Sequence, residues 1–309
     1  MKKSIEYRIV CRRIIFSVLL SMALLFQLTS PVSASQEDGN SGIMVIFDVE
    51  TRETTARTIG RQRTSTFVDV PEPNWPETPV NFHNNTISPF NARNVPHATV
   101  VHNTMVRPYS GVVNIRTTWP HGPATYATGF LYGPNSVATV GHNLFNIYRG
   151  GWANWIEVIP ARNGLNSAPF GTYFAVTMSV HGSWFQSRLE AFDIGFIHLN
   201  SSVHSANIFS LTSPNDASLN GLSVTATGYP EYASVVGSMW RSFGRITSAH
   251  PNSLVSTHPR DSGLSGSPVY NSFGSVIGIH QGNSPGNNSH VVRMTWSNVE
   301  FLNQALWMW

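Results

Sequence analysis

The stretch Asp261-Ser-Gly-Leu-Ser-Gly-Ser-Pro268 places a serine in a tight, glycine-rich turn just before an apolar run. A serine hydroxyl is a useful nucleophile only where a base lies beside it and amide N–H groups point at the developing oxyanion. Gly263 and Gly266 flank Ser265 and let the backbone bend so that such N–H groups can converge. The stretch could also be an ordinary turn between strands, so the choice depends on two segments further upstream.

His142 ends the first of these segments, Ser136-Val-Ala-Thr-Val-Gly-His142. An apolar, β-branched strand followed by a turn would hold the imidazole at the rim of a barrel, with backbone on both sides. Histidine is the natural general base at neutral pH because its ordinary pKa is near 6.5. Taken alone, His142 could equally be a rim histidine without a chemical role.

Asp193 lies in the second segment, Ala191-Phe-Asp193-Ile-Gly-Phe-Ile-His-Leu199. An aspartate at the head of an apolar strand tends to be buried, and a buried carboxylate needs a partner. An imidazole N–H can be that partner, and the bond fixes the tautomer and orientation of the base. A turn or capping role is the alternative for Asp193.

The chain order His142, Asp193, Ser265 is that of chymotrypsin, and it differs from the orders in subtilisin and the α/β-hydrolases. From about residue 105 to the C-terminus, the chain resembles the glutamyl endopeptidase branch of the extracellular bacterial serine proteases with the chymotrypsin fold. Thr139-Val-Gly-His142 resembles the histidine box of that family, Asp193-Ile-Gly its aspartate segment, and Ser265-Gly-Ser-Pro268 its serine box. Thr227-Gly-Tyr-Pro230 resembles a further segment of the branch.

The resemblance implies an all-β fold of two six-stranded antiparallel β-barrels with the triad in the cleft between them. Ser265 would attack the peptide carbonyl, His142 would carry the proton to the leaving amine, and Asp193 would hold the imidazole. The N–H groups of Gly263 and Ser265 would form the oxyanion hole.

The same resemblance implies cleavage after acidic residues, with Glu preferred over Asp. His280 lies 15 residues after Ser265, where the branch carries a histidine that contacts the carboxylate of the substrate. The branch usually has a threonine five residues before the nucleophile, where this chain has Arg260. Thr257 could replace that threonine through a local insertion, or Arg260 could supply a fixed positive charge. His280 could alternatively be a strand histidine bonded to backbone.

Leu264 is a second departure, because trypsin-like digestive enzymes carry an acid before the serine. That acid pairs with the new N-terminal amine on activation, and a leucine cannot do so. Removal of a propeptide would have to activate this chain in another way, for example by freeing the cleft.

The N-terminus predicts export and processing. Lys2, Lys3, Arg8, Arg12 and Arg13 precede an apolar run, Ile14–Phe26, that is too short to span a bilayer comfortably, and Val32-Ser-Ala34 suits cleavage. We therefore expect a signal peptide at 1–34 rather than a membrane anchor, a propeptide at 35–93 with its boundary between 85 and 95, and the protease domain at 94–309. The acidic, proline-rich interval 35–93 could instead be an extension that stays attached. Its one convincing apolar run is Ile43–Phe47.

The only cysteine, Cys11, lies within the predicted signal, so the exported chain would have no disulfide and would depend on its core. From Asn94 onward there are nine arginines, no lysine and seven acids, a weak and scattered charge that argues against a nucleic-acid surface. The remaining histidines show no paired metal-ligand spacing. We expect no cofactor and no metal, polypeptide substrates, no stable membrane association after signal cleavage, and a monomer.

Short β-rich runs bounded by Gly, Pro, Asn and Ser predict a barrel or sandwich rather than βαβ units. These runs are Val112–Thr118, Tyr126–Tyr132, Trp155–Pro160, Tyr173–Val180, Ile194–Leu199, Leu222–Thr227, Ser267–Tyr270, Val276–His280 and Val291–Trp296. A capping box from Ser297 to Glu300 predicts a C-terminal helix. The sequence thus favours a secreted serine endopeptidase. The alternatives are the same fold with another P1 preference, a catalytically silent secreted binding protein and, more weakly, an esterase.

Overall fold

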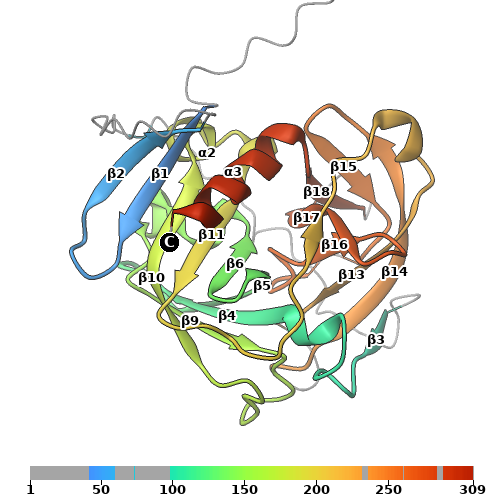
Figure 1. Ribbon diagram of the computed structural model, residues 1–309, viewed down its shortest axis with the longest axis horizontal. Helices are drawn as coiled ribbons and strands as arrows, with labels where there is room; N and C mark the ends of the chain where they lie inside the picture. The colour runs from blue at the N-terminus through green and yellow to red at the C-terminus, as the bar shows by residue number, and fades with distance from the viewer. Residues whose placement is uncertain are drawn as a thin grey trace, which may run out of the picture. The chain divides into compact units, whose positions relative to one another are not determined.

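The first barrel closes on itself through six antiparallel strands in the order β11-β6-β5-β4-β9-β10, with β10 also pairing β11 (Figure 1). This computed structural model describes residues 42–59, 73, 98–231, 236–259, 261–283 and 288–308. The strands of this barrel are β4 (Val112–Thr118), β5 (Thr125–Gly133), β6 (Ser136–Thr139), β9 (Trp155–Pro160), β10 (Tyr173–His181) and β11 (Gly195–Leu199).

The second barrel closes in the same way, in the order β17-β16-β13-β14-β15-β18, with β17 also pairing β18. Its strands are β13 (Ser223–Gly228), β14 (Trp240–Ala249), β15 (Ser253–Ser256), β16 (Pro268–Tyr270), β17 (Ser275–Asn283) and β18 (Ser289–Arg293). The predicted fold class is therefore confirmed: two six-stranded antiparallel barrels.

The remaining elements border the barrels. They are β1 (Ile43–Asp48), β2 (Thr54–Thr58), β3 (Ala98–Val100), β7 (Phe145–Asn146), β8 (Gly151–Trp152), β12 (Ser210–Leu211), α2 (Gly182–Ser187) and α3 (Trp296–Trp307), with five 3₁₀ turns among the described residues. The turns are η1 (Tyr109–Gly111), η2 (Gly141–Asn143), η3 (Ile147–Arg149), η4 (Glu190–Phe192) and η5 (Asp216–Ser218). Among the described residues, neither helix has the length and hydropathy needed to cross a membrane.

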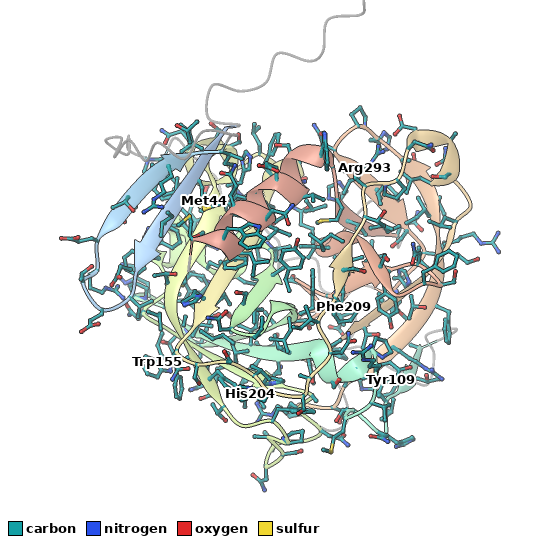
Figure 2. All side chains as sticks on the ribbon, in the orientation of Figure 1. Met44, Tyr109, Trp155, His204, Phe209 and Arg293 are labelled. Carbon is teal, nitrogen blue, oxygen red and sulfur yellow. The ribbon has the colours of Figure 1, made fainter. Side chains whose placement is uncertain are left out.

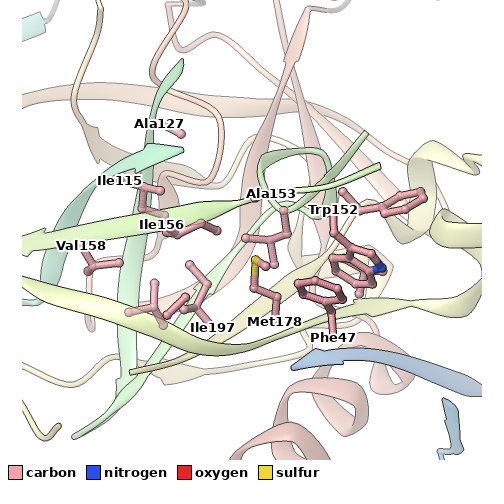
Figure 3. Packing of buried hydrophobic residues seen from close by; sticks show 14 of the residues in the cluster. Phe47, Ile115, Ala127, Trp152, Ala153, Ile156, Val158, Met178 and Ile197 are labelled. Atoms are coloured by element: carbon pink, nitrogen blue, oxygen red, sulfur yellow. The ribbon is translucent and has the colours of Figure 1, made fainter. Parts of the chain in front are cut away.

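Three clusters of buried side chains hold this arrangement together. One fills the first barrel, with Ile115, Met178 and Ile197 among its members (Figure 3). Another fills the second barrel around Ile246 and Ile277. The third cluster joins the two barrels.

Phe209 lies in this joining cluster (Figure 2). Its ring contacts Phe130 of β5 at 5.6 Å and Tyr270 of β16 at 5.6 Å between centroids. Phe301 and Leu302 of α3 belong to the same cluster.

The C-terminal helix is present, but it begins earlier than predicted. Its N-cap is Thr295, whose hydroxyl accepts a hydrogen bond from the N–H of Asn298 at 3.2 Å. Glu300 is instead bonded to Gln304, one turn further along the helix, so the predicted Ser297 capping box was wrong. Trp296, which we predicted to end a strand, is the first residue of this helix.

The strands β1 and β2 form a hairpin within the interval that we predicted to be a propeptide. β1 pairs with β10 of the first barrel, so the sheet extends by two strands beyond the closed barrel. The predicted processing boundary itself lies outside the described residues.

Candidate active site

His142 and Asp193 meet at the edge of the first barrel, which contributes both residues. His142 lies in η2, directly after β6, and Asp193 directly follows η4 and precedes β11. Gly195 of β11 pairs with Thr139 of β6, which brings the two segments together. The strands next to which we expected His142 and Asp193 are therefore neighbours in the first barrel.

Asp193 is fully buried, and both of its oxygens accept hydrogen bonds. Oδ2 lies 2.7 Å from Nδ1 of His142, and Oδ1 accepts the backbone N–H of His142 at 2.8 Å. Nε2 of Gln281 donates to Oδ2 at 2.9 Å. The imidazole is thus fixed at Nδ1 by a carboxylate that also accepts hydrogen bonds from the backbone N–H of His142 and from Gln281.

Gln281 is a site residue that the sequence reasoning missed. Its Oε1 bonds to Nδ1 of His290, which requires Nδ1 to donate and therefore directs the amide Nε2 toward Asp193. A second bond runs from Nε2 to the carbonyl of Glu190 at 3.2 Å. The sequence offered only the position of Gln281 directly after His280 as a signal. A glutamine within a strand forms no recognisable motif by itself.

Ser265 lies on a turn that only glycine can form on its two sides. Gly263 and Gly266 have φ values of 89° and 92°. A Cβ on Gly263 would lie 2.3 Å from the carbonyl oxygen of Tyr229, and one on Gly266 would lie 1.9 Å from that of Thr128. Both the left-handed backbone and the close approach exclude any side chain at these positions.

The nucleophile turn belongs to the second barrel but is fastened to the first. Thr128 of β5 donates its N–H to the carbonyl of Ser265 at 2.9 Å and its hydroxyl to the carbonyl of Gly263 at 2.7 Å. Asn143 donates to the carbonyl of Ser265 at 3.2 Å. The N–H groups of Gly263 and Ser265 share peptide planes with the carbonyls of Ser262 and Leu264. These carbonyls accept the N–H groups of Glu231 at 2.6 Å and Ser267 at 3.0 Å, so the two N–H groups have a fixed direction. Within the described chain, no acceptor is found for the N–H groups of Gly263 and Ser265.

The hydroxyl of Ser265 donates to the carbonyl of Gln281 at 3.1 Å. The same strand, β17, therefore contacts both Ser265 and Asp193, through the backbone and the side chain of one residue. The three predicted catalytic residues are thus linked through Gln281.

His280 is 1% exposed and lies beside the nucleophile turn, since its N–H donates to the carbonyl of Ser267 at 2.9 Å. Its Nε2 lies 2.9 Å from the hydroxyl of Ser289, which in turn donates to the carbonyl of His258 at 2.9 Å. The serine proton is used in that second bond, so Nε2 of His280 carries the proton of the first.

Burial, together with the neighbouring histidines, lowers the pKa of His280 to about 3. Burial likewise lowers the pKa of His258 to about 4. Both rings are therefore neutral at pH 7.

A cavity lies against the nucleophile turn, and Leu264, Ser267 and His280 form part of its wall. Ala98 of β3 also lines it. Thr257 does not: it is exposed, and its hydroxyl accepts the N–H of Arg245 at 3.1 Å. Arg260 lies outside the described residues, so its predicted role stays a prediction.

No family model matches the chain. A Bacillus subtilis (strain 168) protein named Extracellular metalloprotease is 31% identical over 224 residues, which cover 70% of this chain and 71% of that protein. A Glutamyl endopeptidase of Bacillus licheniformis is 31% identical over 172 residues, 56% of this chain and 52% of the relative. A Glutamyl endopeptidase of Staphylococcus aureus (strain MW2) is 25% identical over 229 residues, 72% and 65%.

A solved structure, "Structure of Glu endopeptidase in complex with MPD", superposes with a TM-score of 0.62 at 25% identity and covers 68% of this chain and 96% of that one. The chain belongs to the glutamyl endopeptidase branch of the chymotrypsin-like serine proteases. It is a serine endopeptidase. The chain spans 52% of the length of the Bacillus licheniformis glutamyl endopeptidase and 65% of that of the Staphylococcus aureus one.

A second solved structure, a thermostable serine protease named AL20, superposes with a TM-score of 0.55 at 18% identity and supports the fold alone. The Bacillus subtilis relative carries a name that refers to a metal. In the ranges that the structure describes, no group of three or more His, Cys, Asp or Glu side chains is arranged to hold a metal ion.

Proposed function

We propose that this glutamyl endopeptidase relative is a secreted enzyme, made as a precursor, that cleaves peptide bonds after acidic residues through His142, Asp193 and Ser265. The observation that carries the proposal is the fully buried Asp193 bonded to Nδ1 of His142 at 2.7 Å. A buried carboxylate in this position stabilises the imidazolium that forms when the base takes the serine proton.

The steps follow from the groups in the site. Ser265 attacks the substrate carbonyl while Nε2 of His142 accepts its proton, and the oxyanion that forms is bound by the N–H groups of Gly263 and Ser265. His142 then gives the proton to the leaving amine, which leaves an acyl-enzyme on Ser265. Water, deprotonated by the same imidazole, releases the acid product.

Preference for an acidic residue is supported by two donors beside the nucleophile turn, Nε2–H of His280 and the hydroxyl of Ser289. In this structure Nε2 of His280 bonds to the hydroxyl of Ser289, and that hydroxyl donates to the carbonyl of His258. A carboxylate that accepts from both would gain charge-assisted bonds, and it would favour a proton on His280. A neutral side chain offers neither gain.

Processing is supported by the position of Ala98. It lines the cavity beside His280 and lies three residues after residue 95, where the interval predicted for cleavage ends. A new N-terminus produced in this interval would shortly precede β3, whose residue Ala98 lines the cavity.

The test is cleavage of a peptide library by the secreted protein, with the cut positions mapped by mass spectrometry and Ser265→Ala as control. We expect cuts after Glu, fewer after Asp, and loss of about 10⁴-fold or more in rate in the control. Cuts after other residues would refute the acidic preference but retain the protease. An absence of cuts by folded, processed protein would favour the silent binding protein.

The pocket is tested separately with paired peptides that differ only in Glu or Gln at P1. His280→Leu should lower the Glu-over-Gln ratio of kcat/KM by about 10- to 100-fold, the value of one or two charge-assisted hydrogen bonds. His204→Leu, on an exposed histidine, is the matched control. Titration of Ser265 with an active-site phosphonate confirms that each variant is folded, and an unchanged ratio in folded His280→Leu would exclude the role of His280.

A further inference from the structure

The hairpin of β1 and β2 is built into the enzyme, although it lies in the interval predicted for removal. Its strand β1 adds to β10 in a continuous antiparallel register, from Met44 opposite His181 to Asp48 opposite Thr177. β2 covers the outer side of β1, with Ile43 opposite Thr58. A strand that is paired on both edges satisfies its backbone groups as a core strand does.

The side chains of β1 are buried on both faces of the sheet. Met44, Val45, Ile46 and Phe47 are 1%, 3%, 5% and 3% exposed. Val45 and Phe47 join the core of the first barrel, and Phe47 stacks on Trp152 with 5.1 Å between ring centroids (Figure 3). Met44 and Ile46 join the cluster that contains α3 (Figure 2). Four consecutive buried side chains are typical of a core strand rather than of a tail.

The hairpin also supports the segment that carries Asp193. Met44 pairs with His181, whose ring stacks on Phe192 with 4.5 Å between centroids and an interplanar angle of 19°. Phe192 directly precedes Asp193. His181 also caps α2, and Trp184 of that helix packs against the position of Gly141, next to His142.

We propose that Ile43–Thr58 is a permanent part of the active enzyme, and that it remains bound as a non-covalent partner of β10 after the connection to the protease domain is cut. No cysteine follows Cys11, so the retention depends on strand pairing and packing alone. The bound hairpin is a positioning element: it holds β10, α2 and Phe192 so that Asp193 meets His142.

The test supplies the cut itself, so its outcome depends neither on natural processing nor on substrate preference. A recognition site for an unrelated, highly specific protease is inserted in the connection between Ile59 and Ala98, in a Ser265→Ala background and in the active chain. After complete cutting, the protein is passed over gel filtration under native conditions and the fractions are weighed by intact mass spectrometry. We expect both fragments to elute together in equal amounts, with activity retained in the Ser265 form, and to separate only in denaturant.

Elution of the larger fragment alone, with unchanged melting temperature and activity, would overturn the proposal. Phe47→Ala should weaken retention of the cut hairpin by about 100-fold, since it removes a large buried side chain. Loss of the hairpin should lower kcat. The number of active sites, counted with uncharged peptide inhibitors, should stay constant. Glu53→Ala, on the exposed turn, is the matched control and should retain the hairpin. Loss of the hairpin from Phe47→Ala without a fall in kcat would overturn the positioning role.

Discussion

Gln281 holds the centre of the candidate site, because its side chain contacts Asp193 and His290 while its carbonyl accepts from Ser265. Gln281→Leu keeps the volume of the side chain and removes the donor to the carboxylate. We expect kcat to fall by about 10- to 100-fold with KM little changed, the effect of a lost hydrogen bond to a charged group. Steady-state kinetics on one peptide measures this, with Gln304→Leu on α3 as control. An unaltered kcat would exclude a positioning role for Gln281.

Asp261 presents the opposite case, a buried carboxylate without a well-formed hydrogen bond among the described residues. Burial raises the pKa of Asp261 to about 7; the backbone N–H of Ser262 opposes this rise and the charge of Glu231 adds to it. A raised pKa in the folded state means that its contribution to stability is complete below the ordinary value near 4 and is lost as pH rises through 7. Asp261→Asn should therefore gain stability relative to the parent as pH increases from 6 to 8, as measured by urea unfolding. A constant difference across that range would contradict the assignment.

At the scale of elements, the bonds from β5 to the nucleophile turn connect the two barrels. Thr128→Val has nearly the same shape but leaves the N–H of Tyr229 and the carbonyl of Gly263 without their partner. We expect a loss of about 2 to 5 kcal/mol in the free energy of unfolding, since each buried orphan group costs about 1 to 3 kcal/mol. Denaturant unfolding measures it. Thr118→Val, on β4 and less buried, should cost far less.

The sequence predicted some elements well because their side chains repeat apolar residues at strand spacing. β4 and β9 match the predicted ranges residue for residue. The sequence did not predict β14. Only Ser242 and Ile246 of its ten residues are buried, so the strand has little apolar pattern. The segments that carry His142, Asp193 and Ser265 could be predicted because each is a local motif. Gln281 and Thr128 could not be predicted, since their roles arise from contacts between distant strands.

Stability of the whole molecule should depend on pH through its buried histidines. The pKa of His258 is lowered to about 4 and that of His280 to about 3, while both would titrate near 6.5 in the unfolded chain. The unfolded state thus takes up protons first, and stability falls as pH decreases from about 6.5 to about 4, by up to about 1 kcal/mol per pH unit for each ring. His258→Gln should flatten this dependence in urea unfolding at pH 7, 5.5 and 4.5. The raised pKa of Asp261 makes stability rise as pH falls over part of this range. Asp261→Asn should therefore make the loss of stability with falling pH steeper.

The cluster that joins the barrels contains Met44 and Ile46 from the beginning of the described chain and Phe301, Leu302 and Ala305 from its end. Synthesis of the last helix is therefore needed before this cluster can be completed. The hairpin leaves the ribosome early, but Met44 and Ile46 lack part of the cluster they pack in until α3 has followed. Until α3 has been made, the two barrels therefore lack part of the core that joins them.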